Sequence, residues 1–338
     1  GGMYARKIWL VGTEAGVGVR HAGTLGGGAD EIRVTAAGRL EITGLASSAG
    51  VLEVTAAQGL SNRGTLYAGT GADVRVAGEL DNNGGLIASR GDLRVRDAAG
   101  GERSLSISNT GGTLFAGGES LALDAASLSG DGRVLGVNDV DVRLTRDYAH
   151  TGVLAANRHL SLTTSGTVIN QAEITAGASL QVRADQIHNE AGGTFAATQV
   201  FLHATAPHAL INRGLVDGSE VRLKSTTIKN LDTGRIYGDH VKLAADLVQN
   251  EAGAGAGSSP VIAARTRLDI AAEQISNREG ALLYSAGDLA IGRRLDEQGY
   301  ASGQARLLEN SSATIEALGN VDIAADEVRN LNAHHSTR

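Results

Sequence analysis

The chain has 338 residues, a formal net charge of −7 and no cysteine, which excludes zinc–thiolate sites, disulfide frameworks and cysteine nucleophiles. It contains 47 glycines, 2 prolines and only 3% aromatic residues, so we expect a thin core of many similar layers rather than a compact aromatic core. Acidic residues and arginines alternate along the chain, which indicates no basic stripe for nucleic acid. No run approaches the roughly 18 apolar residues of a membrane span, so membrane insertion is not expected.

A three-residue unit, an apolar residue, any residue and asparagine, recurs at intervals of about 20 residues. Its asparagines are Asn62, Asn82, Asn109, Asn170, Asn189, Asn212, Asn230, Asn250, Asn277, Asn310 and Asn330. A glycine often follows within a few residues, and two further short units precede the next asparagine. These are apolar–x–small, as in Leu66-Tyr67-Ala68, and apolar–x–apolar, as in Val74-Arg75-Val76.

The spacing within these units predicts strands, because residues i and i+2 of a strand point to the same side. Three short strands and three corners in about 20 residues are typical of one coil of a triangular parallel β-helix. The sequence therefore predicts an all-β fold, a right-handed parallel β-helix (β-solenoid) of roughly 17 coils.

The recurrent asparagine would face inward, where a buried amide must be hydrogen bonded. Asparagines at the same corner of successive coils can bond to one another, so the eleven residues are expected to form a structural asparagine ladder. The alternative is a row of amides that holds a ligand. Leu128-Ser129-Gly130 and Tyr148-Ala149-His150 occupy this position without asparagine.

Three longer intervals interrupt the repeat and predict loops extruded from the coils, near residues 98–103, 253–260 and 293–304. The last of these contains Arg293, Arg294 and Tyr300, which we regard as candidates for an adhesive surface. Tolerated variation in loop length is the alternative interpretation.

A second adhesive candidate is the tripeptide Arg90-Gly91-Asp92, an RGD sequence of the kind that some adhesins use to engage integrins. In other coils, the turn at the same position of the repeat reads Gly71-Ala72-Asp73 or Gly287-Asp288. The repeat by itself therefore accounts for the glycine and the aspartate.

Catalytic, cofactor-binding and metal-binding residues are not indicated, since motifs such as HExxH, a Walker lysine or a GxGxxG loop between strand and helix do not occur. We expect no cofactor and no enzyme activity. A β-helix polysaccharide lyase or hydrolase is an alternative, and it would need carboxylates clustered on one face. A binding module that grips host cells or glycans through its loops is another.

The repeats from about Leu60 to Asn330 resemble those of filamentous haemagglutinins and contact-dependent growth inhibition (CdiA-like) exoproteins, the large secreted partners of two-partner secretion. The opening segment ends in Arg20-His21-Ala22-Gly23, where this family usually has Arg-Asn-Ala-Gly, and is similar to the end of its secretion domain. The resemblance implies that residues 1–25 are the tail of a secretion-domain-like region and that residues 26–338 are a haemagglutinin-repeat stalk. The Asn-Pro-Asn type secretion motif does not occur in the chain.

The resemblance also implies a function and a location. The segment would be the extracellular stalk of a large adhesin or contact-dependent inhibition exoprotein, a rigid spacer that presents distal binding or toxin domains. The parent would be secreted or held at the bacterial surface in association with the outer membrane. Its expected partners are an outer-membrane two-partner secretion transporter, engaged through an upstream domain, and a host or neighbouring bacterial cell surface.

Overall fold

The computed structural model describes residues 1–16, 18–26, 28, 30–99, 103–205 and 207–334, and these residues form strands, turns and connecting segments without a helix. Strands make up 62% of the described residues and stack in parallel into a β-solenoid of about 15 turns. The predicted parallel β-solenoid is confirmed. The number of turns is lower than the expected 17 because the longer connecting segments consume residues without adding coils. Helices able to cross a membrane are lacking in the described part of the chain.

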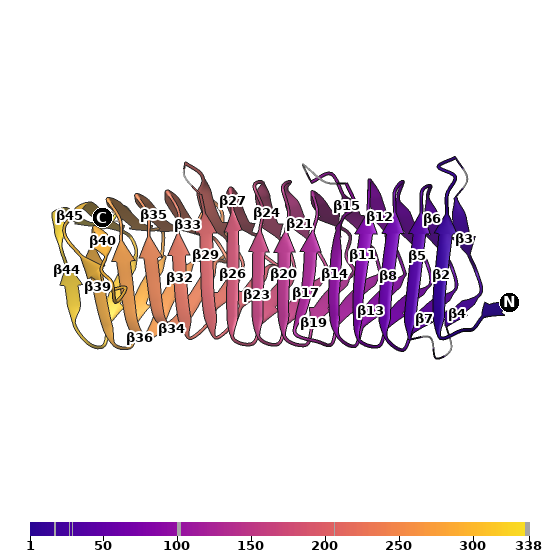
Figure 1. Ribbon diagram of the computed structural model, residues 1–338. Helices are drawn as coiled ribbons and strands as arrows, with labels where there is room; N and C mark the ends of the chain where they lie inside the picture. The colour runs from indigo at the N-terminus through magenta and orange to yellow at the C-terminus, as the bar shows by residue number, and fades with distance from the viewer. Residues whose placement is uncertain (17, 27, 29, 100–102, 206, 335–338) are drawn as a thin grey trace. The chain divides into compact units, whose positions relative to one another are not determined.

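The chain divides into two compact units, residues 1–166 (unit 1) and residues 167–338 (unit 2). Within each unit, Figure 1 shows strands of successive coils side by side, so that each coil contributes one strand to each of three walls. Neighbouring strands of a wall pair in parallel with aligned registers, as in Val34↔Val54 and Val54↔Val74. The walls are called the first, the second and the asparagine wall.

In unit 1 the first wall consists of β1 (Gly2–Met3), β4 (Thr24–Gly26), β7 (Leu45–Ser48), β10 (Thr65–Ala68), β13 (Leu86–Ser89), β16 (Thr113–Ala116), β19 (Arg133–Gly136) and β22 (Val153–Ala156). The second wall consists of β2 (Lys7–Gly12), β5 (Glu31–Ala36), β8 (Val51–Ala56), β11 (Gly71–Val76), β14 (Asp92–Asp97), β17 (Ser120–Asp124), β20 (Asp139–Arg143) and β23 (His159–Thr163). The asparagine wall consists of β3 (Val19–His21), β6 (Leu40–Ile42), β9 (Leu60–Asn62), β12 (Glu79–Asp81), β15 (Ser106–Ser108), β18 (Ser127–Ser129) and β21 (Tyr148–His150).

In unit 2 the first wall contains β25 (Glu173–Ala176), β28 (Thr194–Ala196), β31 (Leu215–Asp217), β38 (Leu282–Ser285) and β43 (Thr314–Ala317). The second wall contains β26 (Ser179–Ala184), β29 (Gln199–Ala204), β32 (Glu220–Lys224), β39 (Asp288–Gly292) and β44 (Val321–Ile323). The long strands β34 (Arg235–Ala244) and β36 (Val261–Ala271) run through both walls. The asparagine wall contains β24 (Thr167–Asn170), β27 (Gln186–Asn189), β30 (Ala209–Asn212), β33 (Thr227–Leu231), β35 (Leu247–Glu251), β37 (Gln274–Arg278), β42 (Ala305–Ser311) and β45 (Ala325–Leu331).

The core follows from the alternation of each strand. In β8, Leu52, Val54 and Ala56 are at most 1% exposed, whereas Glu53 and Thr55 between them face outward. Because the registers align, apolar residues stack on apolar residues from coil to coil, and burial of these rows drives folding. A core built this way needs no large aromatic residue.

After five of the asparagines, the residue two positions later has an unusual, left-handed backbone conformation. In unit 1, Gly84 and Gly111 have φ angles of +68° and +61°. Glycine adopts this left-handed region without a steric penalty. In unit 2 the same position is held by Asp232, Glu279 and Ser312, with φ angles of 50–55°.

The predicted loops differ in structure. The interval 253–260 lies between β35 and β36 and contains no strand. Residues 100–102 of the predicted 98–103 loop lie outside the described residues, as does residue 17 of the predicted 1–25 region. Within 293–304, by contrast, β40 (Arg294–Leu295) and β41 (Ala301–Ser302) pair in antiparallel as a hairpin. Asp296 organises its turn, since its Oδ1 accepts the N–H groups of Gln298 and Tyr300, both at 2.9 Å.

Candidate functional site

The asparagines of unit 2 are joined by direct amide–amide hydrogen bonds. Each Nδ2 group from Asn170 to Asn310 donates to Oδ1 of the next asparagine along the chain, at 2.8–2.9 Å, up to Asn330. The side chains from Asn170 to Asn277 are at most 1% exposed. Most of these Nδ2 groups also donate to a main-chain carbonyl in the first wall, as Asn189 does to Leu215 at 3.1 Å.

In unit 1 the row of linked asparagines is shorter. Nδ2 of Asn62 donates to Asn82 at 2.7 Å, and Nδ2 of Asn82 donates to Asn109 at 2.8 Å. Asn62 stacks on Ile42, which offers no donor. Its Oδ1 atom is buried and has no hydrogen-bond partner among the described residues.

At several corners the amide row leaves room for nothing larger than the Hα atom of a glycine. A Cβ atom added to Gly85 would lie 2.7 Å from both Asn62 Nδ2 and Asn82 Oδ1. Glycines after Asn109, Asn189 and Asn230 are similarly placed against the ladder. The asparagine and the glycine of the repeat thus serve one corner together, and its amides face one another rather than a ligand.

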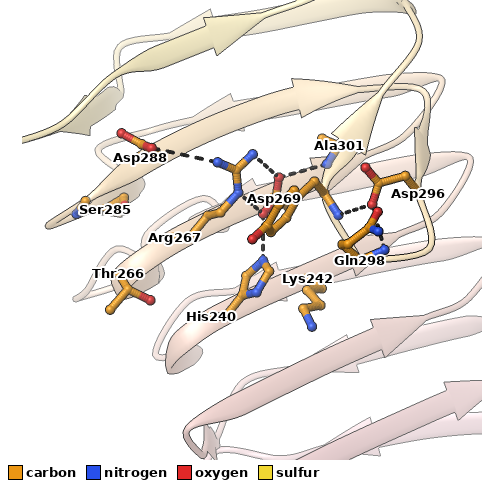
Figure 2. A network of polar contacts seen from close by, with 12 residues as sticks. His240, Lys242, Thr266, Arg267, Asp269, Ser285, Asp288, Asp296, Gln298 and Ala301 are labelled. Carbon is orange, nitrogen blue, oxygen red and sulfur yellow. Dashed lines mark hydrogen bonds and ion pairs between the residues drawn. The ribbon is translucent and has the colours of Figure 1, made fainter.

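A second buried polar group lies on the outer face of the second wall in unit 2 (Figure 2). Asp269 is 0% exposed, although it occupies an outward-facing position of β36. Its carboxylate accepts Nε2–H of His240 at 2.6 Å and a two-pronged contact from the Arg267 guanidinium at 2.7 and 3.0 Å. The main-chain N–H of Ala301, from the hairpin, also donates to it at 2.8 Å.

The hairpin is what buries this carboxylate. The Tyr300 ring lies over the Arg267 guanidinium at 4.2 Å and near the His240 ring at 5.6 Å. Burial raises the pKa of Asp269, but the hydrogen bonds from His240, Arg267 and the Ala301 N–H outweigh it, so the pKa is lowered overall. The cluster therefore holds an ionised aspartate that anchors the hairpin to the wall.

The His240–Asp269 pair resembles two members of a catalytic triad, but a nucleophile is not positioned for it. Nδ1 of His240 faces Oε2 of Glu220 at 4.0 Å. The neighbouring hydroxyl of Thr266 donates to the Asp239 carbonyl at 2.7 Å, and Ser285 Oγ accepts the Gly287 N–H at 3.2 Å. Within the described residues, no group of three metal-ligating side chains occurs.

A pocket of about 380 Å³ lies beside the hairpin, on the same face of unit 2. The titratable side chains that line it are His203, Arg222, Lys224, Asp246, Arg293 and Arg294. The structure thus brings two of the predicted adhesive candidates, Arg293 and Arg294, together with a histidine of β29 and two cations of β32. Tyr300, the third candidate of that loop, lies instead in the Asp269 cluster.

The RGD tripeptide lies in unit 1, away from these residues in the sequence, at the turn that leads into β14. Arg90 and Asp92 are exposed. The Asp92 carboxylate accepts the Ser120 N–H at 3.0 Å, and Gly91 packs against the Thr70 carbonyl. The tripeptide is thus built into the stacking of coils.

Sequence reasoning missed Asp269, His240 and Arg267, because Leu268-Asp269-Ile270 looks like any other unit with an outward charge. Nothing local predicts that a hairpin covers it. A signal did exist for the pocket, because Arg222 and Lys224 occupy two outward-facing positions of one strand, β32.

Coils of similar sequence, stacked in parallel around a row of amides, define a repeat-built parallel β-solenoid. The chain matches the haemagglutinin repeat family over residues 10–44, 47–117, 104–184, 169–269 and 244–336. These segments cover most of the chain, and the chain belongs to the haemagglutinin repeat family.

Among curated proteins, the chain is similar to Toxin CdiA of Yersinia pestis, with 51% identity over 67 residues, which is 20% of this chain and 2% of the relative. It is also similar to the tRNA nuclease CdiA of Escherichia coli (strain STEC_O31), with 26% identity over 51% of this chain and 6% of the relative. The tRNA nuclease CdiA of Yersinia mollaretii is 26% identical over 73% of this chain and 8% of that protein. The chain spans no more than 8% of the length of these relatives.

Solved structures gave no match to this chain. The family and the CdiA relatives support a segment of a large secreted or cell-surface exoprotein.

Proposed function

We propose that this chain is a spacer segment of its exoprotein, which holds distal binding or toxin domains away from the cell surface to which the parent is attached. The single observation that carries this proposal is the continuous stacking of unit 2, where eight consecutive asparagines are linked by amide hydrogen bonds. In a solenoid each coil contacts only its neighbours, so length can grow without a change of core.

The same stacking supports a role in export. A chain that leaves an outer-membrane transporter unfolded can dock each coil on the one before it, and the free energy of stacking would then favour outward movement. We propose that residues 1–25 are the end of the secretion-domain-like region and that residues 26–338 are the stalk. Export at the normal rate by variants whose stacking is broken would contradict the role in export.

A non-catalytic role is supported by the ion pairs that the aspartate carboxylates form with arginines. Asp73 lies between Arg75 and Arg96, at 2.7 and 2.8 Å, and the hydrogen bonds from both arginines outweigh burial to lower its pKa. Asp139 is paired with Arg158 at 2.8 Å in the same way. Carboxylates paired with arginine on neighbouring coils stabilise stacking and are not poised for acid–base chemistry. The nuclease activity named for two relatives would then belong to other parts of those proteins.

A second candidate function is an adhesive surface for host cells or glycans. The hairpin favours it, because Arg293, Arg294 and Tyr300 depart from the repeat and are held on the outer face of unit 2. The RGD tripeptide at Arg90, Gly91 and Asp92 is the other adhesive candidate, with its aspartate engaged by Ser120.

The two candidates are separated by measuring how the purified 338-residue chain binds to host and bacterial cells. A variant with residues 293–304 replaced by glycine and serine is compared with the parent chain. A spacer predicts that neither binds, whereas an adhesive hairpin predicts binding that the variant loses. Binding that both share would place an adhesive surface elsewhere, and an Asp92→Ala variant then tests the tripeptide.

A further inference from the structure

The pocket beside the hairpin is lined mainly by basic residues, although the chain as a whole is acidic. Five of its lining residues carry basic side chains, His203, Arg222, Lys224, Arg293 and Arg294, and one, Asp246, is acidic. The chain as a whole has a formal net charge of −7. Like charges gathered in one place repel one another and raise the local concentration of anions.

Three of these cations are not neutralised by the protein. Arg222, Lys224 and Arg294 have no ion-pair partner among the residues that the structure describes, and all three are exposed. Nearby cations behave differently: Arg293 lies 3.5 Å from Asp246 and 3.7 Å from Glu273, and Lys242 lies 2.8 Å from Glu220. The pocket therefore retains an excess of positive charge.

The basic side chains come from β29, β32 and the hairpin, whose backbones are held by register pairing and by Asp269. Lys224 and His203 are register partners on β32 and β29, so their side chains leave the same face one coil apart. Arg294 comes from the hairpin, which the buried Asp269 anchors through the Ala301 N–H. Burial, followed by the charges of Arg183, Lys224 and Arg222, lowers the pKa of His203, as expected for a strongly positive surface.

We propose that this pocket binds a tetrahedral oxyanion, a phosphate or sulfate group that is either free or carried as an ester on a larger molecule. The guanidinium groups of Arg222 and Arg294 each offer a planar fork of N–H donors that matches such oxygens, and Lys224 adds a point charge. A spacer needs no such site, so the inference goes beyond the proposed function and does not depend on it.

The first experiment is calorimetric titration of the 338-residue chain at low ionic strength with inorganic phosphate, glucose 6-phosphate, glucose 6-sulfate and acetate. We expect saturable binding of the phosphate and sulfate probes at least about tenfold tighter than of acetate, which presents fewer acceptor oxygens. Equal affinity for inorganic phosphate and its sugar ester identifies the group alone as the ligand. Tighter binding of an ester points to a larger molecule.

The second experiment uses Lys224→Gln and Arg294→Gln, which keep a polar side chain and remove one charge from each side of the pocket. Each is expected to weaken binding of the best probe about tenfold. Lys229→Gln is the matched control, because it removes the same charge from β33 on the asparagine wall and should change binding less than about twofold. All variants are checked for parental circular dichroism.

The proposal is overturned if no phosphate or sulfate probe binds saturably, or if acetate binds as well as they do. It is equally overturned if Lys229→Gln weakens binding as much as Lys224→Gln, since that would mean only a diffuse attraction. None of these results bears on the spacer role, which is tested by binding to cells.

Discussion

The two units build the same coil but fill its asparagine corner differently. In unit 2, eight asparagines form one unbroken row of amide hydrogen bonds. In unit 1, only Asn62, Asn82 and Asn109 are linked, while Ile42 and His150 occupy the corresponding corner of other coils. Both units keep the same aligned walls and buried apolar rows, so the coil itself does not require the ladder.

In the ladder, each asparagine side chain depends on its neighbours for its hydrogen bonds. An amide inside the row is satisfied by neighbours on both sides, whereas one at the end depends on a single neighbour, as the unpartnered Oδ1 of Asn62 illustrates. Buried polar groups are strongly stabilising as a complete network and costly when the network is broken. The comparison therefore predicts that the same chemical change has unequal effects in the two units.

The largest effect is expected from Asn212→Leu, inside the row of unit 2. It would leave one Nδ2 hydrogen of Asn189 and the Oδ1 of Asn230 unpaired in the core, which costs about 2–6 kcal/mol for the two groups together. The measurement is the urea concentration at the midpoint of unfolding, monitored by circular dichroism.

The matched control is Asn62→Ile, at the end of the row in unit 1. It removes the orphaned Oδ1 and extends the apolar stack begun by Ile42, but it leaves Oδ1 of Asn82 without its donor. Because only one buried group is left unpaired, we expect a loss of about 1–3 kcal/mol, smaller than that of Asn212→Leu. Equal losses for Asn212→Leu and Asn62→Ile would break the comparison, because the ladder would then act residue by residue rather than as a network.

A smaller effect is expected from Asp269→Asn, which spares the ladder of unit 2 but releases the hairpin. The amide cannot accept the contacts from His240, Arg267 and Ala301 together, and the loss is about 2–3 kcal/mol. Hydrogen exchange at the Ala301 amide should accelerate, while exchange in β33 and β35 stays slow.

The lowered pKa of Asp269 adds a pH dependence to this cluster. An aspartate whose pKa is depressed in the folded state contributes stability that is fully present above its unfolded value of about 3.9. That stability is lost as the pH falls through the lower folded value. Protection of the Ala301 amide should therefore persist at neutral pH and begin to decline only below about pH 4, and this decline should be absent in Asp269→Asn.

In unit 1, the corner filled by His150 is tested by Tyr148→Phe. The Tyr148 hydroxyl and Nδ1 of His150 lie 2.8 Å apart in the core, and removal of that hydrogen bond costs about 1 kcal/mol. Burial raises the pKa of Tyr148, so this phenol should not titrate in the folded chain when the pH is raised through 10. Absorbance at alkaline pH checks the second expectation, and ionisation near pH 10 without unfolding would show that the ring is not buried.

Two further effects, of opposite sign, concern the residue two positions after the asparagine. Gly84→Ala in unit 1 forces a side chain into the left-handed region and should cost about 1–2 kcal/mol, as judged by the unfolding midpoint. Glu279→Gly in unit 2 relieves the same strain and should gain up to about 1 kcal/mol, since its exposed contact with His334 contributes little. A destabilised Glu279→Gly variant would mean that unit 2 has adapted its corners to non-glycine residues.

The sequence was sufficient to identify the coil. Alternating apolar residues, an asparagine and a glycine at intervals of about 20 residues predict three walls, their inward faces and the position of each amide, because strand periodicity is local and every coil repeats it. The same regularity accounts for the aligned stacking of Val34, Val54 and Val74.

Only the tertiary structure decided what the irregular parts do. The sequence marks residues 293–304 as an interruption but does not indicate that they form a hairpin or that its Tyr300 and Ala301 settle on Asp269. The burial of Asp269, which looks like an ordinary outward charge, depends on that contact between segments about 30 residues apart. The physical reason is that periodicity specifies which face a residue occupies, whereas the environment of that face depends on what folds back over it.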